Sequence, residues 1–339
     1  MDSLSQLALG AAVGVAVMGR RTAAWKAALW GGVAGTLPDL DVLIEHGDPI
    51  RNMVLHRAET HSLFWLTLFS LPLAAGVARL GGEWAQWRRW WLAIWLALVT
   101  HPLLDAMTVY GTQLALPFSD WPFGVGSVFI IDPLYTLPLL AGAGWALASR
   151  GSPRGLHANA VGLLLSTAYL AWGAAAQAHV ERVARGALAA QGIRAEQLLV
   201  TPTAFNSVLW RVVALAGPHY HEGFYSLLDA RPQIVFDRFE RGTALGPALQ
   251  NIDGVQRIAA FSKGFYKLHA EGDRLFVTDL RMGQEPSYIF TFAVAEHGSA
   301  ARPLRPPEQV GARPDLRRGL PWLWRRLWGE ALPPPRRAC

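Results

Sequence analysis

Apolar residues dominate the first half of the chain, where they fall into six runs separated by short polar stretches. The last four runs reach the ~20 residues that a membrane-spanning helix needs. The first two runs are shorter and rich in Gly and Ala, which allows helices to pack closely. The pattern predicts an all-α polytopic membrane bundle of about six transmembrane helices, at roughly 4–18, 23–37, 62–80, 90–110, 128–149 and 158–177.

The two short runs have an alternative arrangement as a re-entrant hairpin. A hairpin would leave Arg20, Arg21 and Lys26 at mid-membrane, where each charge costs ~2.5–3.5 kcal/mol or more. Two short spanning helices are therefore favoured. If all six runs span, the arginine-rich loops share one side, which the positive-inside rule assigns to the cytoplasm. The acidic loops and the C-terminal domain are then expected on the periplasmic side.

The composition of the chain changes near His179. Beyond it, short runs of β-branched and aromatic residues predict antiparallel strands at 208–214, 265–269, 275–280 and 287–294. Two further stretches, 181–190 and 249–261, predict helices. We therefore expect a membrane domain over residues 1–178, a soluble α+β domain over 179–301 and a Pro/Arg-rich basic tail over 302–339. The segment Trp322–Trp328 of this tail fits either a disordered tail or a stretch that lies on an anionic membrane surface.

Composition supports a membrane protein and narrows its chemistry. Of the residues, 52% are hydrophobic and only 17% are charged, against about a quarter charged in soluble domains. The net charge of +6 is explained by loop arginines and the basic tail, and no basic helix or aromatic-basic motif favours nucleic-acid binding. Because the only cysteine is Cys339, an intrachain disulfide and a thiolate metal site are excluded.

Three polar patterns interrupt the apolar runs: Pro-Asp-Leu-Asp at 38–41, His-Arg-Ala-Glu-Thr-His-Ser at 56–62, and His-Pro-Leu-Leu-Asp at 101–105. His101 and Asp105 are four residues apart, so a helix presents both on one face, within a span where ionisable groups are costly. Each pattern alone also has a structural explanation. The pattern at 38–41 could be an acidic turn, the histidines at 56–62 could face solvent, and the pair at 101–105 could bridge two helices. The predicted topology places all of them in the outer half of the bilayer, which a shared metal site explains.

The residue types select the metal. Histidine and aspartate without cysteine suit Zn²⁺ best, with Mn²⁺ or Fe²⁺ as alternatives. Six candidate groups exceed the needs of one tetrahedral ion, so one or two ions are expected. The predicted ligands are Asp39, Asp41, His56, His61, His101 and Asp105.

Such a site favours hydrolysis. A divalent metal lowers the pKa of bound water to ~7, Glu59 could accept the proton, and Arg57 could hold a phosphate or carboxylate of the substrate. We therefore predict a membrane-bound hydrolase that acts on an ester or phosphoester of a lipid or lipid-linked substrate at the outer bilayer face. One alternative is a non-catalytic membrane scaffold or regulator with a structural metal. The other is a transporter, which would need polar residues along the whole pathway. The cytoplasmic halves of the runs at 62–80, 128–149 and 158–177 have almost none, which disfavours it.

The three patterns and the start Met-Asp-Ser-Leu-Ser-Gln-Leu-Ala-Leu-Gly together resemble the YdjM/YbcI-like family, over roughly residues 1–145. Its members are inner-membrane proteins described as metal-dependent hydrolases. The resemblance implies a multi-pass protein of the bacterial inner membrane. One position departs from the family, which often has His where Gln6 stands. Glutamine is a poor metal ligand, so either Gln6 does not bind the metal or the site has one ligand fewer.

Overall fold

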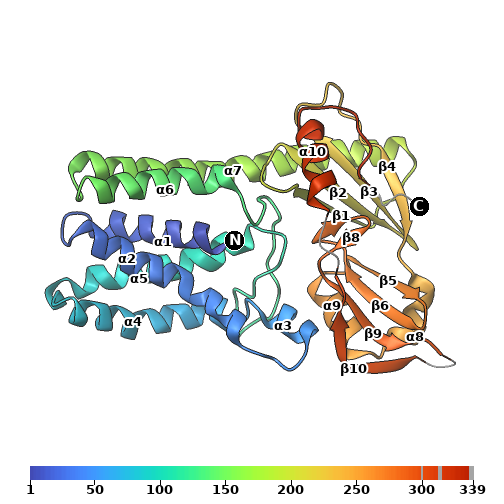
Figure 1. Cartoon of the computed structure of the whole chain (residues 1–339), viewed down its shortest axis with the longest axis horizontal. Coiled ribbons are helices and arrows are strands. Elements are labelled where there is room, and N and C mark those ends of the chain that lie inside the picture. Colours follow the sequence, from blue (N-terminus) through green and yellow to red (C-terminus); the bar gives the residue numbers. More distant parts are fainter. Residues whose placement is uncertain (299–300, 312–314, 336–339) are drawn as a thin grey trace. The chain divides into compact units, whose positions relative to one another are not determined.

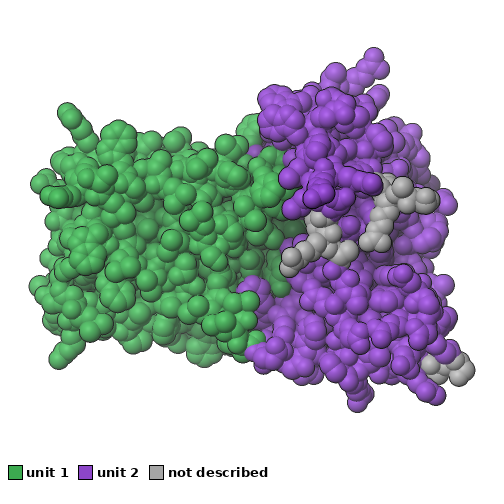
Figure 2. All heavy atoms as spheres, viewed as in Figure 1, with its two compact units in different colours: residues 1–44, 57–174, 204–206 green, residues 45–56, 175–203, 207–339 purple. Residues whose placement is uncertain are grey.

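The computed structural model describes residues 1–298, 301–311 and 315–335, which form two compact units (Figures 1 and 2). The first, called here the helical unit, comprises residues 1–44, 57–174 and 204–206. The second, called the sheet unit, comprises residues 45–56, 175–203 and 207–339 and contains the extended β-sheets. This division confirms the predicted order of a helical N-terminal half followed by a sheet-rich C-terminal domain.

Six helices correspond to the six apolar runs. Two of them, α4 and α7, are long and apolar enough to cross a membrane, and α1 and α6 are shorter apolar helices. A bundle with six spans therefore stays a prediction. Residues 153–174 of α7 belong to the helical unit, and its remainder belongs to the sheet unit. The bounds are α1 (Ser3–Met18), α2 (Ala24–Thr36), α4 (Leu63–Leu80), α5 (Trp87–Ala106), α6 (Pro133–Ala148) and α7 (Pro153–Ala190).

Helices α1 and α2 pack backbone against backbone. Each carries two glycines four residues apart, Gly10 and Gly14 on α1 and Gly31 and Gly35 on α2. A Cβ added at Gly31 would lie 2.2 Å from the carbonyl oxygen of Gly10, and one at Gly10 would lie 2.3 Å from that of Gly31. Small residues at this spacing let membrane helices approach closely. The glycines of these two short runs thus lie at the contact between α1 and α2.

Replacing Gly31 with Ala should therefore separate α1 from α2. Overpacking a tight contact costs about 1–3 kcal/mol, which we expect to appear as a lower melting temperature of the purified protein. The matched control is Gly76→Ala on α4, where an added Cβ meets nothing within 4 Å. This control should be neutral or slightly stabilising, because Ala is a better helix former than Gly. Equal melting temperatures for the two variants would contradict the close packing.

The three polar patterns lie where helices begin or end, at the same end of the helical unit (Figure 1). Helix α2 continues into the 3₁₀ helix η1 (Leu37–Leu43), which contains Asp39. A second short turn, η2 (Glu59–His61), precedes α4, whose first turn is capped by the hydroxyl of Ser62. His101 and Asp105 occupy the last turns of α5. The fold thus brings three separate sequence motifs together.

The first sheet of the sheet unit is an antiparallel meander in the order β1-β2-β3-β4. Val180 and Ala184 in the C-terminal part of α7 belong to one buried cluster with Trp210 and Val212 of β2. The helix predicted at 181–190 is therefore the end of α7 and not a separate element. The strands are β1 (Gln197–Pro202), β2 (Leu209–Ala216), β3 (His219–Ser226) and β4 (Phe236–Glu240).

The second sheet is also antiparallel, in the order β10-β9-β6-β5. Between β6 and β9 the chain forms a short hairpin of β7 (Gly283–Gln284) and β8 (Ser287–Tyr288). Helix α9 (Asp253–Phe261) contacts β6 and the short helix α3 (Pro49–Leu55). The remaining elements are β5 (Tyr266–Glu271), β6 (Arg274–Asp279), β9 (Thr291–Glu296), β10 (Arg302–Gln309), α8 (Gly246–Leu249) and α10 (Leu316–Leu327).

The segment predicted as a basic tail, 302–339, contains β10 and α10, while 312–314 and 336–339 lie outside the described residues.

Candidate metal centre

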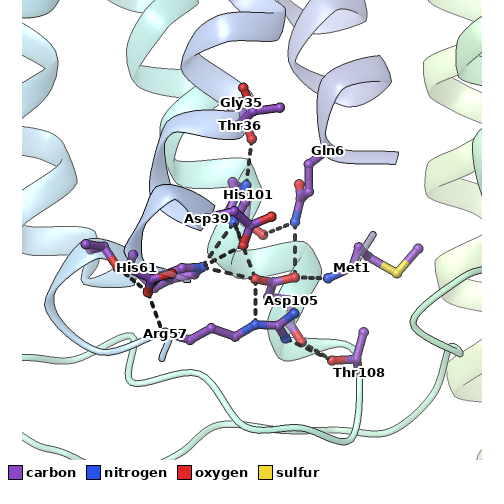
Figure 3. A network of polar contacts seen from close by, with 12 residues as sticks. Met1, Gln6, Gly35, Thr36, Asp39, Arg57, His61, His101, Asp105 and Thr108 are labelled. Carbon is purple, nitrogen blue, oxygen red and sulfur yellow. Dashed lines mark hydrogen bonds and ion pairs between the residues drawn. The ribbon is translucent and has the colours of Figure 1, made fainter. Parts of the chain in front are cut away.

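Four buried or nearly buried side chains converge at the end of the helical unit (Figure 3). They are Asp39, His61, His101 and Asp105, and one ligand atom from each lies within 4.8 Å of the others. The side chains of His61, His101 and Asp105 are fully buried, whereas that of Asp39 is 18% exposed. The site is therefore reached from the side of Asp39.

The spacing of these atoms matches a ligand set. The Nε2 atoms of His61 and His101 are 3.1 Å apart. Each lies 3.4–3.5 Å from Oδ1 of Asp39 and 3.3–3.4 Å from Oδ2 of Asp105. Ligand bonds of ~2.0–2.2 Å around a tetrahedral ion separate neighbouring ligand atoms by about 3.3–3.6 Å. The observed separations are close to this range.

The hydrogen bond behind His101 fixes its tautomer. Its Nδ1 lies 2.6 Å from the carbonyl oxygen of Gly35 in α2. A carbonyl oxygen only accepts, so Nδ1 carries the proton and Nε2 directs a lone pair into the cluster. Such a bond from the second ring nitrogen to a backbone carbonyl is typical of metal-binding histidines.

His61 is oriented in the same way through a hydroxyl. Oγ1 of Thr60 donates to Oδ2 of Asp41 at 2.8 Å and lies 2.9 Å from Nδ1 of His61. Because that hydroxyl proton is engaged by the carboxylate, Nδ1 of His61 donates to Thr60, and in the neutral imidazole the lone pair is then on Nε2. Two imidazole lone pairs thus face each other between two carboxylates, an arrangement that a bound cation stabilises.

Asp105 supplies an oxygen without a hydrogen-bond donor. Its Oδ1 pairs with the amino group of Met1 and accepts from Nε2 of Gln6 at 3.1 Å. Its Oδ2 is buried and accepts no hydrogen bond among the described residues, although Nε of Arg57 lies at 3.3 Å. Buried polar atoms are normally satisfied. This unsatisfied oxygen lies 3.3–3.4 Å from the Nε2 atoms of His61 and His101, and such a set of donor atoms fits a divalent metal.

The model of the YdjM inner membrane protein family matches residues 1–180 of the chain. The chain belongs to this family. The finding confirms the resemblance drawn from the motifs, and the family description indicates an inner membrane protein. The chain is also similar to the "Uncharacterized protein YfhP" of Bacillus subtilis (strain 168), with 29% identity over 147 residues, 42% of this chain and 45% of that protein. It thus spans less than half the length of this curated relative. No solved structure matches.

Within this member of the YdjM family, the other predicted ligands lie elsewhere. Asp41 is behind His61, where Oδ2 accepts from the backbone N–H of Arg57 at 2.9 Å and from Thr60. His56 follows α3 and is not one of the four residues whose ligand atoms converge. Ligation by any of the six residues stays a prediction.

The two predicted catalytic residues flank the cluster differently. Arg57 is buried, with Nε beside Asp105 and its guanidinium 4.9 Å from the ring centre of Tyr110. It is therefore placed to neutralise Asp105. Glu59 is exposed and lines a hollow beside the site together with Thr60.

Sequence reasoning did not assign Gly35 and Thr60, which orient the two imidazoles. The four-residue spacing of glycines in two neighbouring apolar runs is the signal that points to Gly35, because it predicts a close helix pair. In the sheet unit, His219 pairs with Glu240 at 2.9 Å and Glu222 pairs with Arg211. Among the described residues, no second group of this kind is found.

Proposed function

We propose that the chain is a membrane-bound metal-dependent hydrolase that cleaves an ester or phosphoester of a lipid or lipid-linked substrate. The observation that carries the proposal is the pair of imidazole Nε2 atoms, 3.1 Å apart, which lie between two carboxylate oxygens. In the six-span arrangement that we propose, the site opens at the periplasmic face of the inner membrane and the sheet unit is periplasmic.

A hollow beside the cluster supports a lipid substrate. It has a volume of about 290 Å³, and apart from Glu59 and Thr60 its wall is apolar. Pro38 and Thr60 in this wall immediately precede Asp39 and His61 in the sequence, so the hollow adjoins the metal ligands. The other lining residues are Leu37, Trp65, Leu66, Phe69 and Leu98.

The outer wall of the hollow is formed by α4, a candidate membrane span, where Trp65 and Phe69 are 43% and 49% exposed. Apolar side chains exposed on such a helix face hydrocarbon. A lipid chain held there would present its ester or phosphoester group to the cluster.

The roles of the residues follow from this position. A bound divalent cation, Zn²⁺ most favourably and Mn²⁺ or Fe²⁺ otherwise, supplies an activated water and polarises the bond under attack. Gly35, and Thr60 with Asp41, hold the two imidazoles with their Nε2 atoms inward. Glu59, in the wall of the hollow, is the candidate acceptor of the water's proton.

The proposal is tested on the purified full-length protein in lipid nanodiscs, loaded with Zn²⁺ or Mn²⁺ and given phospholipids or polyprenyl phosphates. We expect release of a phosphate or fatty-acid product that is lost with a chelator and restored by the metal. Asp39→Asn should abolish release, because the amide is a weaker ligand that carries no charge.

His56→Ala is the matched control and should retain activity, since His56 lies outside the four-residue group. A folded, metal-loaded protein that releases nothing from any of these lipids would overturn the hydrolase and favour a scaffold whose metal is structural.

A further inference from the structure

Helix α10 (Leu316–Leu327) is held to the first sheet by one face only. Trp322 packs edge-on against Phe224 of β3, with ring centres 5.0 Å apart. Arg326 forms a double ion pair with Asp229 at 2.5 and 2.7 Å and donates to the carbonyl oxygen of Phe224. Both residues are less than 10% exposed. The attachment fixes which side of the helix faces outward.

The outward side carries an apolar stripe at four-residue spacing. Leu316, Leu320 and Trp324 of α10 are 59%, 45% and 61% exposed, and the C-cap residue Trp328 is 58% exposed. Residues four apart lie on one face of a helix. A folded domain gains nothing by exposing two tryptophans and two leucines side by side in water, so a contiguous patch of this kind marks an interaction surface.

Arginines border this stripe. Arg317, Arg318 and Arg325 are all exposed. Arg318 lies near Asp315 at 3.8 Å and Arg325 pairs with Glu330, and both pairs are open to solvent. Exposed ion pairs are weak and readily exchange partners. The border of the stripe is thus basic and able to bind anionic groups.

We propose that the outward face of α10, called here the α10 stripe, docks on the surface of a bilayer that contains anionic lipid. Tryptophan favours the interface between hydrocarbon and water, and arginine stems reach from an apolar surface to headgroup phosphates. An apolar stripe edged by basic side chains is the pattern of helices that lie in the membrane plane.

The observations favour a bilayer over a second copy of the chain. Two α10 stripes brought together would oppose their arginines, which is unfavourable. A bilayer is also always at hand, because the family is one of inner membrane proteins and the sheet unit is tethered to the helical unit through α7. The inference is independent of the metal centre and of the proposed hydrolase.

The test uses a fluorescent probe on the stripe of the full-length chain. Cys339, the only cysteine, is replaced by Ser, and Leu320→Cys is labelled with an environment-sensitive dye. The protein is reconstituted into phosphatidylcholine vesicles with or without phosphatidylglycerol, and quenching by lipids with a nitroxide on the acyl chain is measured.

We expect the ratio of quenched to unquenched probe to be roughly a hundredfold higher with anionic lipid, since each of the three arginines near such a surface contributes roughly a factor of five. The triple variant Arg317→Glu/Arg318→Glu/Arg325→Glu should remove the difference. A probe at Val235→Cys, an exposed apolar position at 84%, is the matched control and should not respond to lipid charge.

Two results would overturn the proposal. One is quenching at Leu320→Cys that is equal in both vesicles or absent from both. The other is a blue shift of the dye in detergent that grows with protein concentration, because it would identify a second copy of the chain as the occupant.

Discussion

Replacing His101 with Ala should reduce the bound transition metal from about one ion per chain to nearly none. The substitution removes one imidazole from a set of four converging ligand groups and leaves the carbonyl oxygen of Gly35 without its donor. The three remaining groups hold a metal more weakly. Elemental analysis of the purified full-length protein, after incubation with Zn²⁺ or Mn²⁺, measures the change directly.

The matched control for this experiment is His56→Ala, which removes a histidine from the same sequence motif as His61. His56 contributes no atom to the four-residue group, so the control should keep its metal. Loss of metal from His56→Ala with retention in His101→Ala would reverse the assignment. A wild-type preparation that stays folded but binds no metal would remove the metal centre itself.

The motif at 56–62 shows how far sequence predicts such a site. Its residue types and its position before an apolar run identify it as a candidate, but the spacing of five does not say which histidine turns inward. The structure resolves this at Arg57, whose backbone has φ of 68°, a left-handed conformation that redirects the chain between the two histidines. A local turn of this kind in an arginine leaves no signature in the sequence.

Asp39 and Asp41 illustrate the same limit. Both belong to one short motif, and both are carboxylates suited to metal binding. In the 3₁₀ helix η1 they face different partners, so that Asp39 joins the cluster and Asp41 supports His61 through Thr60. By contrast, His101 and Asp105 follow from sequence alone, because four-residue spacing on a helix determines that they share a face.

Strands such as β2 and β6 were predictable, because their side chains alternate or form an apolar run. A strand that forms only through tertiary contacts was not. Strand β10 has three prolines within eight residues and no apolar pattern, but it forms the edge of its sheet, where proline is tolerated. Helix α10 is similar, because its apolar face was visible in Trp322–Trp328 while its docking depends on Asp229, which is distant in the sequence.

Replacing Arg211 with Met should destabilise the sheet unit by about 3–5 kcal/mol. Arg211 is buried in β2, and its Nη2 lies 2.6 Å from Oε2 of Glu222, which is also buried. It further donates to the carbonyl oxygen of Leu280 at 2.8 Å and to the hydroxyl of Tyr288 at 3.2 Å. Burial lowers the pKa of Arg211, but the Glu222 carboxylate outweighs it, and the pKa is raised.

The cost comes from the charge that remains. Without Arg211, the Glu222 carboxylate stays buried and loses its charged partner, while the N–H of Glu285 lies 3.3–3.4 Å from its oxygens. Thermal unfolding of the purified full-length chain measures the loss. Arg274→Met is the matched control, because Arg274 pairs with Glu308 on the exposed edge of the other sheet, and its removal should leave the melting temperature nearly unchanged.

A double variant separates the charge from the shape of the side chain. Arg211→Met/Glu222→Leu removes both charges, and buried pairs replaced by apolar residues of similar volume often regain most of the stability. We therefore expect a melting temperature close to that of the wild type. If the double variant is as unstable as Arg211→Met, the loss arises from packing of the arginine stem and from the bonds to Leu280 and Tyr288, and the ion pair is not what holds β2 and β3 in register.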